Sequence, residues 1–182
     1  MKGCSPYAVA RLLVERAEAE LQTARAGAPD RSAVMPDKPP FEFCDQLFAV
    51  VVSYAPTPAR IPSTVKSCAT SWRVNVTVGV YRCDPSINSS HPEDAPDPVA
   101  LDSAARDQLD DAEALRRAIL NADWSLLDVD PEQVQVGPMR VAARSGGGFG
   151  VEHDVVVDTE LGWFTDQAVP MLPGDPRKDT TP

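Results

Sequence analysis

The sequence predicts an α+β domain in which two helices pack against a mainly antiparallel sheet of four to five strands. The first observation is a strict alternation over residues 72–83, where every even position from Trp72 to Val80 is apolar. The odd positions are Arg73, Asn75, Thr77, Gly79 and Tyr81. A period of two indicates a strand with one buried and one wet face. The second observation is a pair of segments with helical periodicity, and the predicted order of elements is α-β-β-α-β-β.

The first helix is predicted to begin at residue 6 and to extend for about twenty residues. Ser5 and Pro6 form a helix cap followed by a first-turn proline, whose fixed φ suits a helix start. The apolar residues that recur on one face are Val9, Leu12, Leu13, Ala17 and Leu21. Gly27 and Pro29 are expected to end this helix.

A loop, a strand and a long connection are predicted between this helix and the alternating segment. Residues 28–40 contain four prolines and are expected to form a loop. Residues 41–54 are rich in aromatic and β-branched residues, which favours a strand. Residues 55–71 contain three further prolines. They are expected to fold over a sheet edge or to reach towards a partner.

The second helix is predicted to follow a proline-rich loop at residues 84–97. It begins with the same signal of a cap and a proline, at Asp97-Pro98. Its apolar stripe consists of Leu101, Ala105, Leu109, Ala112, Leu115 and Ile119. Its outer face is expected to be acidic, with Asp102, Asp107, Asp110, Asp111 and Glu113.

The last third of the chain predicts two strands and a tail. Residues 134–143 form a strand whose Gly137-Pro138 pair indicates an edge position or a bulge. The glycine-rich residues 145–150 are expected to form a hairpin tip before a final strand at 151–161. Residues 1–165 are predicted to be a single domain, and 166–182 a proline-rich flexible tail that meets a partner.

The formal net charge of −10 disfavours a protein that grips nucleic acid, because duplex binders need a basic face. An acidic surface can still lie beside DNA when its task is to avoid sticking to it. The sequence contains no apolar run long enough to cross a bilayer, and no apolar signal-peptide core follows Met1. We therefore expect the chain to be in the cytoplasm when it is synthesised.

The four cysteines, Cys4, Cys44, Cys68 and Cys83, are widely spaced, and the chain has only two histidines. This pattern does not have the spacing of a zinc site. In the cytosol the default expectation is free thiols that behave as small apolar side chains. A Cys68–Cys83 or a Cys44–Cys83 bridge is the alternative, which the sequence leaves open.

The sequence predicts no enzyme activity, no cofactor and no metal site. Residues 145–150 lack the Lys-Ser/Thr pair of a phosphate loop and precede a strand. The carboxylates next to His153 point to the opposite face of its strand, which favours a buried core or interface histidine. Asp107, Asp110 and Asp111 lack a loop of carbonyl ligands, which favours a solvated face over a metal cluster.

The order of these elements resembles a known family over residues 41–160. A cysteine precedes an apolar strand, a proline-rich connection leads to an alternating strand, and an acidic helix is followed by glycine elements and a last strand. The motifs in chain order are Cys44, Cys68, 79–83, 107–119, 137–138 and 146–148. The pattern is similar to that of the tail terminators, which are small neck proteins of long-tailed actinobacteriophages.

The resemblance implies a structural virion protein of a siphovirus, assembled as a homohexameric ring at the top of a non-contractile tail. Such a ring binds the last ring of tail-tube protein, stops its polymerisation and presents its other face to the head-tail connector. DNA is expected only to pass through the bore, without specific binding, and no membrane partner is expected. The implied location is the virion neck, after assembly in the host cytoplasm.

Two sets of residues are candidates for contacts in such a ring. Contacts with the ring or the tube are expected at Pro62, Thr64, Cys68, Arg82, Ser145, Gly146, Gly147, Gly148 and Phe149. The acidic residues Asp107, Asp110 and Asp111 are expected to line the lumen. The alternatives are a head-completion (stopper) protein or another neck connector, a monomeric binding module and, as a third class, an enzyme.

Overall fold

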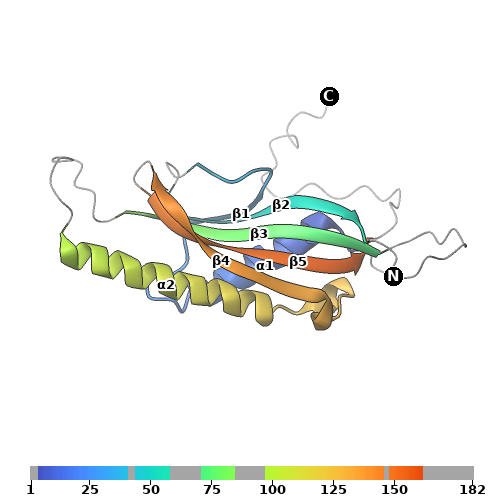
Figure 1. Ribbon diagram of the computed structural model, residues 1–182. Helices are drawn as coiled ribbons and strands as arrows, with labels where there is room; N and C mark the ends of the chain where they lie inside the picture. The colour runs from blue at the N-terminus through green and yellow to red at the C-terminus, as the bar shows by residue number, and fades with distance from the viewer. Residues whose placement is uncertain (1–3, 41–43, 58–70, 85–96, 146–147, 162–182) are drawn as a thin grey trace, which may run out of the picture.

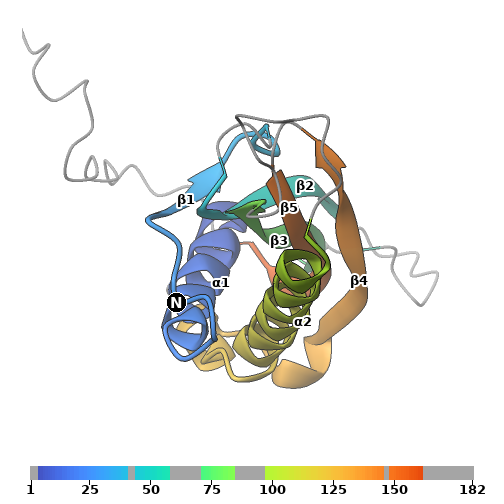
Figure 2. The ribbon, with the colours of Figure 1, turned by 90° about the vertical axis from the view of Figure 1, so that its left-hand side faces the viewer.

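The computed structural model describes residues 4–40, 44–57, 71–84, 97–145 and 148–161. These ranges form one five-stranded sheet with both helices on a single face, which confirms the α+β class (Figures 1 and 2). The elements in order are α1 Pro6–Leu21, β1 Arg31–Met35, β2 Gln46–Pro56, β3 Ser71–Cys83, α2 Pro98–Leu120, the 3₁₀ turns η1 Trp124–Leu127 and η2 Pro131–Gln133, β4 Val134–Ser145 and β5 Gly148–Glu160. The predicted tail at 166–182 lies outside the described residues.

The sheet is mixed, with the strand order β1-β2-β3-β5-β4. β1 runs parallel to β2, whereas all other neighbouring strands are antiparallel. The predicted order of elements therefore missed β1, which lies in the segment expected to be a loop. Its five residues are flanked by Pro29 and Pro36, and a strand this short is fixed by pairing with β2 and not by its own pattern.

Both predicted helix starts are confirmed. The Ser5 hydroxyl accepts a hydrogen bond from the Ala8 amide (3.1 Å), and the Asp97 carboxylate accepts one from the Val99 amide (3.1 Å). In each helix a proline occupies the first turn. α1 ends at Leu21, so it is shorter than the prediction that placed its end at Gly27 and Pro29.

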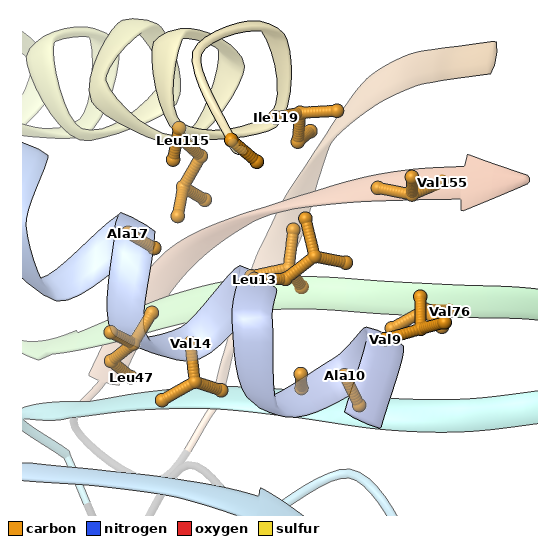
Figure 3. Close-up of a cluster of buried hydrophobic side chains, with 14 of the residues drawn as sticks. Val9, Ala10, Leu13, Val14, Ala17, Leu47, Val76, Leu115, Ile119 and Val155 are labelled. Atoms are coloured by element: carbon orange, nitrogen blue, oxygen red, sulfur yellow. The ribbon is translucent and has the colours of Figure 1, made fainter. Parts of the chain in front are cut away.

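The main core lies between the helices and the sheet (Figure 3). Its labelled members are Val9, Ala10, Leu13, Val14 and Ala17 from α1, Leu47, Val76 and Val155 from the sheet, and Leu115 and Ile119 from α2. Burying each of the larger side chains contributes about 1.5–3 kcal/mol. The predicted stripe of α1 therefore faces the sheet, as its spacing indicates.

The opposite face of the sheet is less exposed than the alternation of β3 predicts. Thr77 and Tyr81 are buried there, although the sequence indicated a wet face. Phe48 from β2 packs edge to face on Tyr81, with ring centroids 4.7 Å apart. A Cβ on Gly79 would lie 2.6 Å from Phe48 Cζ, so this close approach requires glycine. A second, smaller cluster therefore occupies this face.

A disulfide bond joins Cys44 to Cys83, with their Cα atoms 4.8 Å apart. The default expectation of free thiols is therefore wrong for these two residues, and one of the two alternative bridges is present. Cys4 is a free, buried thiol, and Cys68 lies outside the described residues. The bond fixes the start of β2 to the end of β3.

Reduction of this disulfide is expected to lower the free energy of unfolding by about 2–4 kcal/mol, because it releases a loop in the unfolded chain. The bond closes a sequence separation of 39 residues. Urea unfolding with and without dithiothreitol measures the loss. A Cys44→Ser, Cys83→Ser double variant is the control and should be insensitive to the reductant. An equal response of the two proteins would contradict a stabilising bond.

Candidate assembly surface

Arg82 and Asp111 form a buried ion pair that connects β3 to α2. The Arg82 Nε and Nη2 atoms each donate to one Asp111 carboxylate oxygen at 3.0 Å, and only 1% of Asp111 is exposed. The same guanidinium donates to the Asp45 carboxylate (3.1 Å) and to the Gly27 carbonyl (2.6 Å). One side chain therefore holds together β3, α2, the start of β2 and the loop after α1.

Because both side chains are buried, the charge of each one has to be compensated by the other. Desolvation raises the pKa of the Asp111 carboxyl, while the hydrogen bonds and charge of Arg82 oppose that rise. Asp107 and Asp110 add repulsion that also raises this pKa. Removing one partner of a buried pair leaves an uncompensated charge, which is more costly than the pair itself. The pairing with Arg82 therefore fixes the direction in which Asp111 points, and with it the rotation of α2 about its axis.

The predicted acidic lumen face is wrong for Asp111, because this side chain points into the domain. The other two predicted lumen residues are bound to Arg25 in the loop after α1. Arg25 Nε lies 3.2 Å from Asp107 Oδ1, and the Arg25 amide donates to Asp110 Oδ2 at 2.6 Å. These carboxylates thus help to join α2 to the end of α1.

The described residues among those predicted for ring or tube contact lie together at one end of β3, β4 and β5, where they are paired within the sheet. Arg82 and Phe149 are both buried, so the expectation that they lie at a contact surface is wrong. Phe149 pairs with Arg82 across β3 and β5, because β5 already begins at Gly148. Ser145 ends β4 and pairs with Gly148. The remaining predicted residues, Pro62, Thr64, Cys68, Gly146 and Gly147, lie outside the described ranges.

With Asp111 facing inwards, Leu109 is turned out to solvent. Leu109 was expected in the buried stripe of the second helix, but 62% of it is exposed. Around a helix axis with 3.6 residues per turn, the Leu109 side chain lies about 120° from that of the buried Leu115. The Asp110 side chain lies about 140° from that of Leu115 in the opposite direction of rotation. Asp110 faces the loop after α1, so Leu109 faces the side away from α1, where β4 lies (Figure 2). Leu120 follows Leu109 on the same side and is also exposed, and the exposed ion pair of Glu113 and Arg116 lies between them.

Three apolar residues of β4 add to this side. Val136, Met139 and Val141 are exposed, and they pair in register with Val155, His153 and Val151 of β5. Those partners face the helices, so the three β4 side chains project on the helix side of the sheet. We call the set of Leu109, Leu120, Val136, Met139 and Val141 the α2–β4 patch.

β4 is also an edge strand. It pairs with β5 on one side, and no strand of the described chain pairs with its other side. The register shifts between Val136 and Met139, at the Gly137-Pro138 pair, which confirms the predicted bulge at a sheet edge. An unpaired edge beside exposed apolar side chains is a site where another chain can add.

The opposite face of the sheet carries a set of paired polar groups. Tyr81 donates to Glu152 (2.7 Å), which also accepts from Lys38 Nζ (2.5 Å). Asp154 accepts from Thr77 (2.8 Å) and from Arg140 Nη2 (2.6 Å). Burial and the nearby Glu152 raise the pKa of the Tyr81 hydroxyl above its ordinary range. These polar groups bind one another, and they hold β3, β4 and β5 together on this face of the sheet.

His153 is buried on the helix side, as the sequence predicts. Its Nε2 lies 3.2 Å from the Ala112 carbonyl and its Nδ1 lies 3.4 Å from the Gly137 carbonyl. Its neighbours Glu152 and Asp154 bind partners on the other face, so they do not orient the ring. The imidazole thus connects α2 to the bulge of β4.

Within the described ranges, no group of three or more His, Cys, Asp or Glu side chains is placed to hold a metal ion. None of the helices in those ranges has the length and apolar character needed to cross a membrane. The sequence matches no model of a known protein family, and it matches no curated protein.

Sequence reasoning missed this patch because it assigned Leu109 to the core. A signal was present in the small residues Ala104, Ala114 and Ala118, which are buried and define the true inner face of α2. Asp111 falls on that face, and a buried aspartate has to be matched with a cation elsewhere in the chain. Arg82 at the end of β3 is that cation. Its pairing with Asp111 is a long-range contact, which a local sequence pattern does not reveal.

Replacing Asp111 by Asn is expected to lower the free energy of unfolding by about 3 kcal/mol, because it removes the buried counterion of Arg82 and leaves the more exposed Asp45 as the carboxylate bound to it. The matched control is Asp102→Asn on the same helix, whose pair with Arg106 is exposed. That change is expected to cost less than about 0.5 kcal/mol. Urea denaturation measures both values, and similar losses in the two variants would contradict the proposed dependence of α2 on Arg82.

Asp154 is expected to make stability depend on pH in the acid range. Burial alone would raise the pKa of this carboxyl, but the hydrogen bonds from Arg140 and Thr77 lower it below its ordinary value. A lowered pKa contributes stability that is present above the unfolded value of about 3.9 and is lost as the pH falls through the folded value. The measurement is unfolding of the native protein and of Asp154→Asn between about pH 5 and 2. The difference between the two should shrink as the pH falls, and a constant difference would contradict this assignment.

Proposed function

We propose that this chain is a structural protein of a phage neck, which forms a ring at the head-tail junction. In this role it terminates polymerisation of the tail tube and joins the tail to the head connector. The observation that carries the proposal is the α2–β4 patch beside the open edge of β4. The order of the motifs resembles that of tail terminators, and this resemblance indicates that the assembly is a ring in the phage neck.

The patch supports an assembly role because its exposure is enforced by the fold. Arg82 holds Asp111 inwards, and this fixes Leu109 and Leu120 on the outside of α2. Met139 and Val141 of β4 lie on the same side of the sheet. Exposed apolar side chains beside an unpaired strand favour a protein contact. Covering them with another chain would remove apolar surface from water, which stabilises an assembly.

A ring requires contacts between unlike surfaces of successive copies, arranged so that rotation closes the circle. Terminating a tube further requires one ring face that fits the tube and another that rejects a further tube ring. The net charge of −10 suits a bore through which DNA slides, since like charges repel. Each of these properties follows from surfaces rather than from catalytic groups.

Deletion of the gene from the phage that encodes it, followed by negative-stain microscopy, tests this function. Loss of a terminator is expected to give overlong or headless tails, because tube growth is no longer stopped. Loss of a stopper protein, the alternative neck role, would instead give heads that leak DNA. Virions of normal form would reject both neck roles.

The size of the purified protein separates the neck role from a monomeric binding module. Multi-angle light scattering should show an oligomer, either alone or after mixing with purified tail tubes. A chain that remains monomeric in both cases would contradict the ring. Complementing the deletion with the native gene should restore tails of normal length, which excludes effects on neighbouring genes.

A further inference from the structure

We propose that the α2–β4 patch binds the β1 edge of a second copy of this chain, so that β4 and the next copy's β1 pair as antiparallel strands. This inference rests on the proposed ring and names the contact between its subunits. It identifies the occupant of the patch as the opposite edge of the same sheet. Two sheets then join into one continuous layer from copy to copy.

Within the described chain the sheet has two open edges. β1 and β4 are its outer strands, and each has a strand partner on one side only within the described chain. Unpaired edge groups are satisfied when another strand adds to them. Joining β4 to the β1 of the next copy uses both kinds of edge, and in a closed ring no sheet edge stays open.

The directions of the two outer strands suit this pairing. β1 is parallel to β2, and each following neighbour in the order β2-β3-β5-β4 is antiparallel. β4 therefore runs opposite to β1. Placing a second copy beside the first in the same orientation brings its β1 against β4 as an antiparallel pair, which is the more stable pairing. Residues 139–142, which pair regularly with β5 between the two register shifts of β4, offer four positions to the five residues of β1.

The helix layer can continue from copy to copy in the same way as the sheet. Glu18 of α1 accepts a hydrogen bond from Ser32 of β1, so this side of α1 faces the β1 edge. Tyr7 lies eleven residues earlier, about 20° away around the helix, and it is exposed. Leu109 and Leu120 lie on the corresponding outer side of α2. A neighbour placed by strand pairing therefore sets Tyr7 of one copy towards the outer side of α2 of the other.

Pairing β4 with a second β4 across a two-fold axis would also cover the patch. That arrangement leaves both β1 edges open, with Tyr7 and the half-buried Ala33, Val34 and Met35 uncovered. It also yields a closed pair of subunits, which cannot form a ring with two different faces. The unlike pairing of β4 with β1 covers both edges, so it is the contact that we assign.

Cross-linking with engineered cysteines tests this contact in the full chain. One preparation carries Val141→Cys on β4, and a second preparation with a different mass tag carries Ser32→Cys on β1, both with Cys68→Ser. Residues 32 and 141 project on the helix side of the sheet, so paired strands would bring them within reach of a short bismaleimide. A cross-link between unlike copies is expected. Cross-linking of Val141→Cys only to itself, or the absence of any link between copies, would overturn the proposal.

A matched pair of charge variants gives an independent measurement. Val141 on β4 and Val52 on β2 are both 60% exposed, but only Val141 lies on an open edge strand of the sheet. Val141→Glu should weaken self-association at least about tenfold, because it brings a charge into the contact. Val52→Glu should leave self-association unchanged, and circular dichroism checks that both variants fold. Equal effects of the two changes would overturn the proposal.

Failure of this inference can be told apart from failure of the proposed function. An oligomer that forms without the 32–141 cross-link overturns the β4–β1 contact and leaves the neck role standing. A chain that is monomeric even with tail tubes, together with normal virions after gene deletion, overturns both. Abnormal tails after deletion, with no link between copies, reject only the β4–β1 contact.

Discussion

The buried pair of Arg82 and Asp111 is the interaction on which the arrangement of this domain depends. It places an aspartate on the inner face of a helix, where an apolar side chain would ordinarily lie. Two charges can occupy that position because each satisfies the other with two hydrogen bonds. Once this pair is made, the rotation of α2 is set, and the residues that α2 presents to solvent are set with it.

Cys83, the residue next to Arg82, fixes the end of β3 on the other face of the sheet. Successive residues of a strand point to opposite faces, so Arg82 projects towards the helices and Cys83 away from them. Arg82 holds α2 and Asp45, while Cys83 is bonded to Cys44. The end of β3 is thus fixed to the start of β2 from both sides, by an ion pair and by a covalent bond. This rigid corner supports both the helix layer and the sheet.

The same corner supports a defined outer surface of the domain. On the face of the sheet away from the helices, charged side chains bind one another, as in the set formed by Glu152, Asp154 and Arg140. The apolar residues of the α2–β4 patch gather beside an open strand, on the side of α2 that the ion pair has turned outwards. Covering such a surface with another chain removes apolar area from water, which stabilises the assembly. This links the local electrostatics of α2 to the proposed ring.

The sequence by itself determined the class of the fold, both helix starts, the strand alternation of β3 and the bulge at the edge position of β4. Each of these depends on local periodicity, on a capping residue or on a glycine-proline pair. Only the tertiary structure decided the parallel strand β1, the Cys44–Cys83 bond and the inward turn of Asp111. These depend on partners far away in the chain, which periodicity does not reveal. The candidate surface belongs to the second group, because Leu109 faces solvent in a helix whose Asp111 is turned inwards to Arg82.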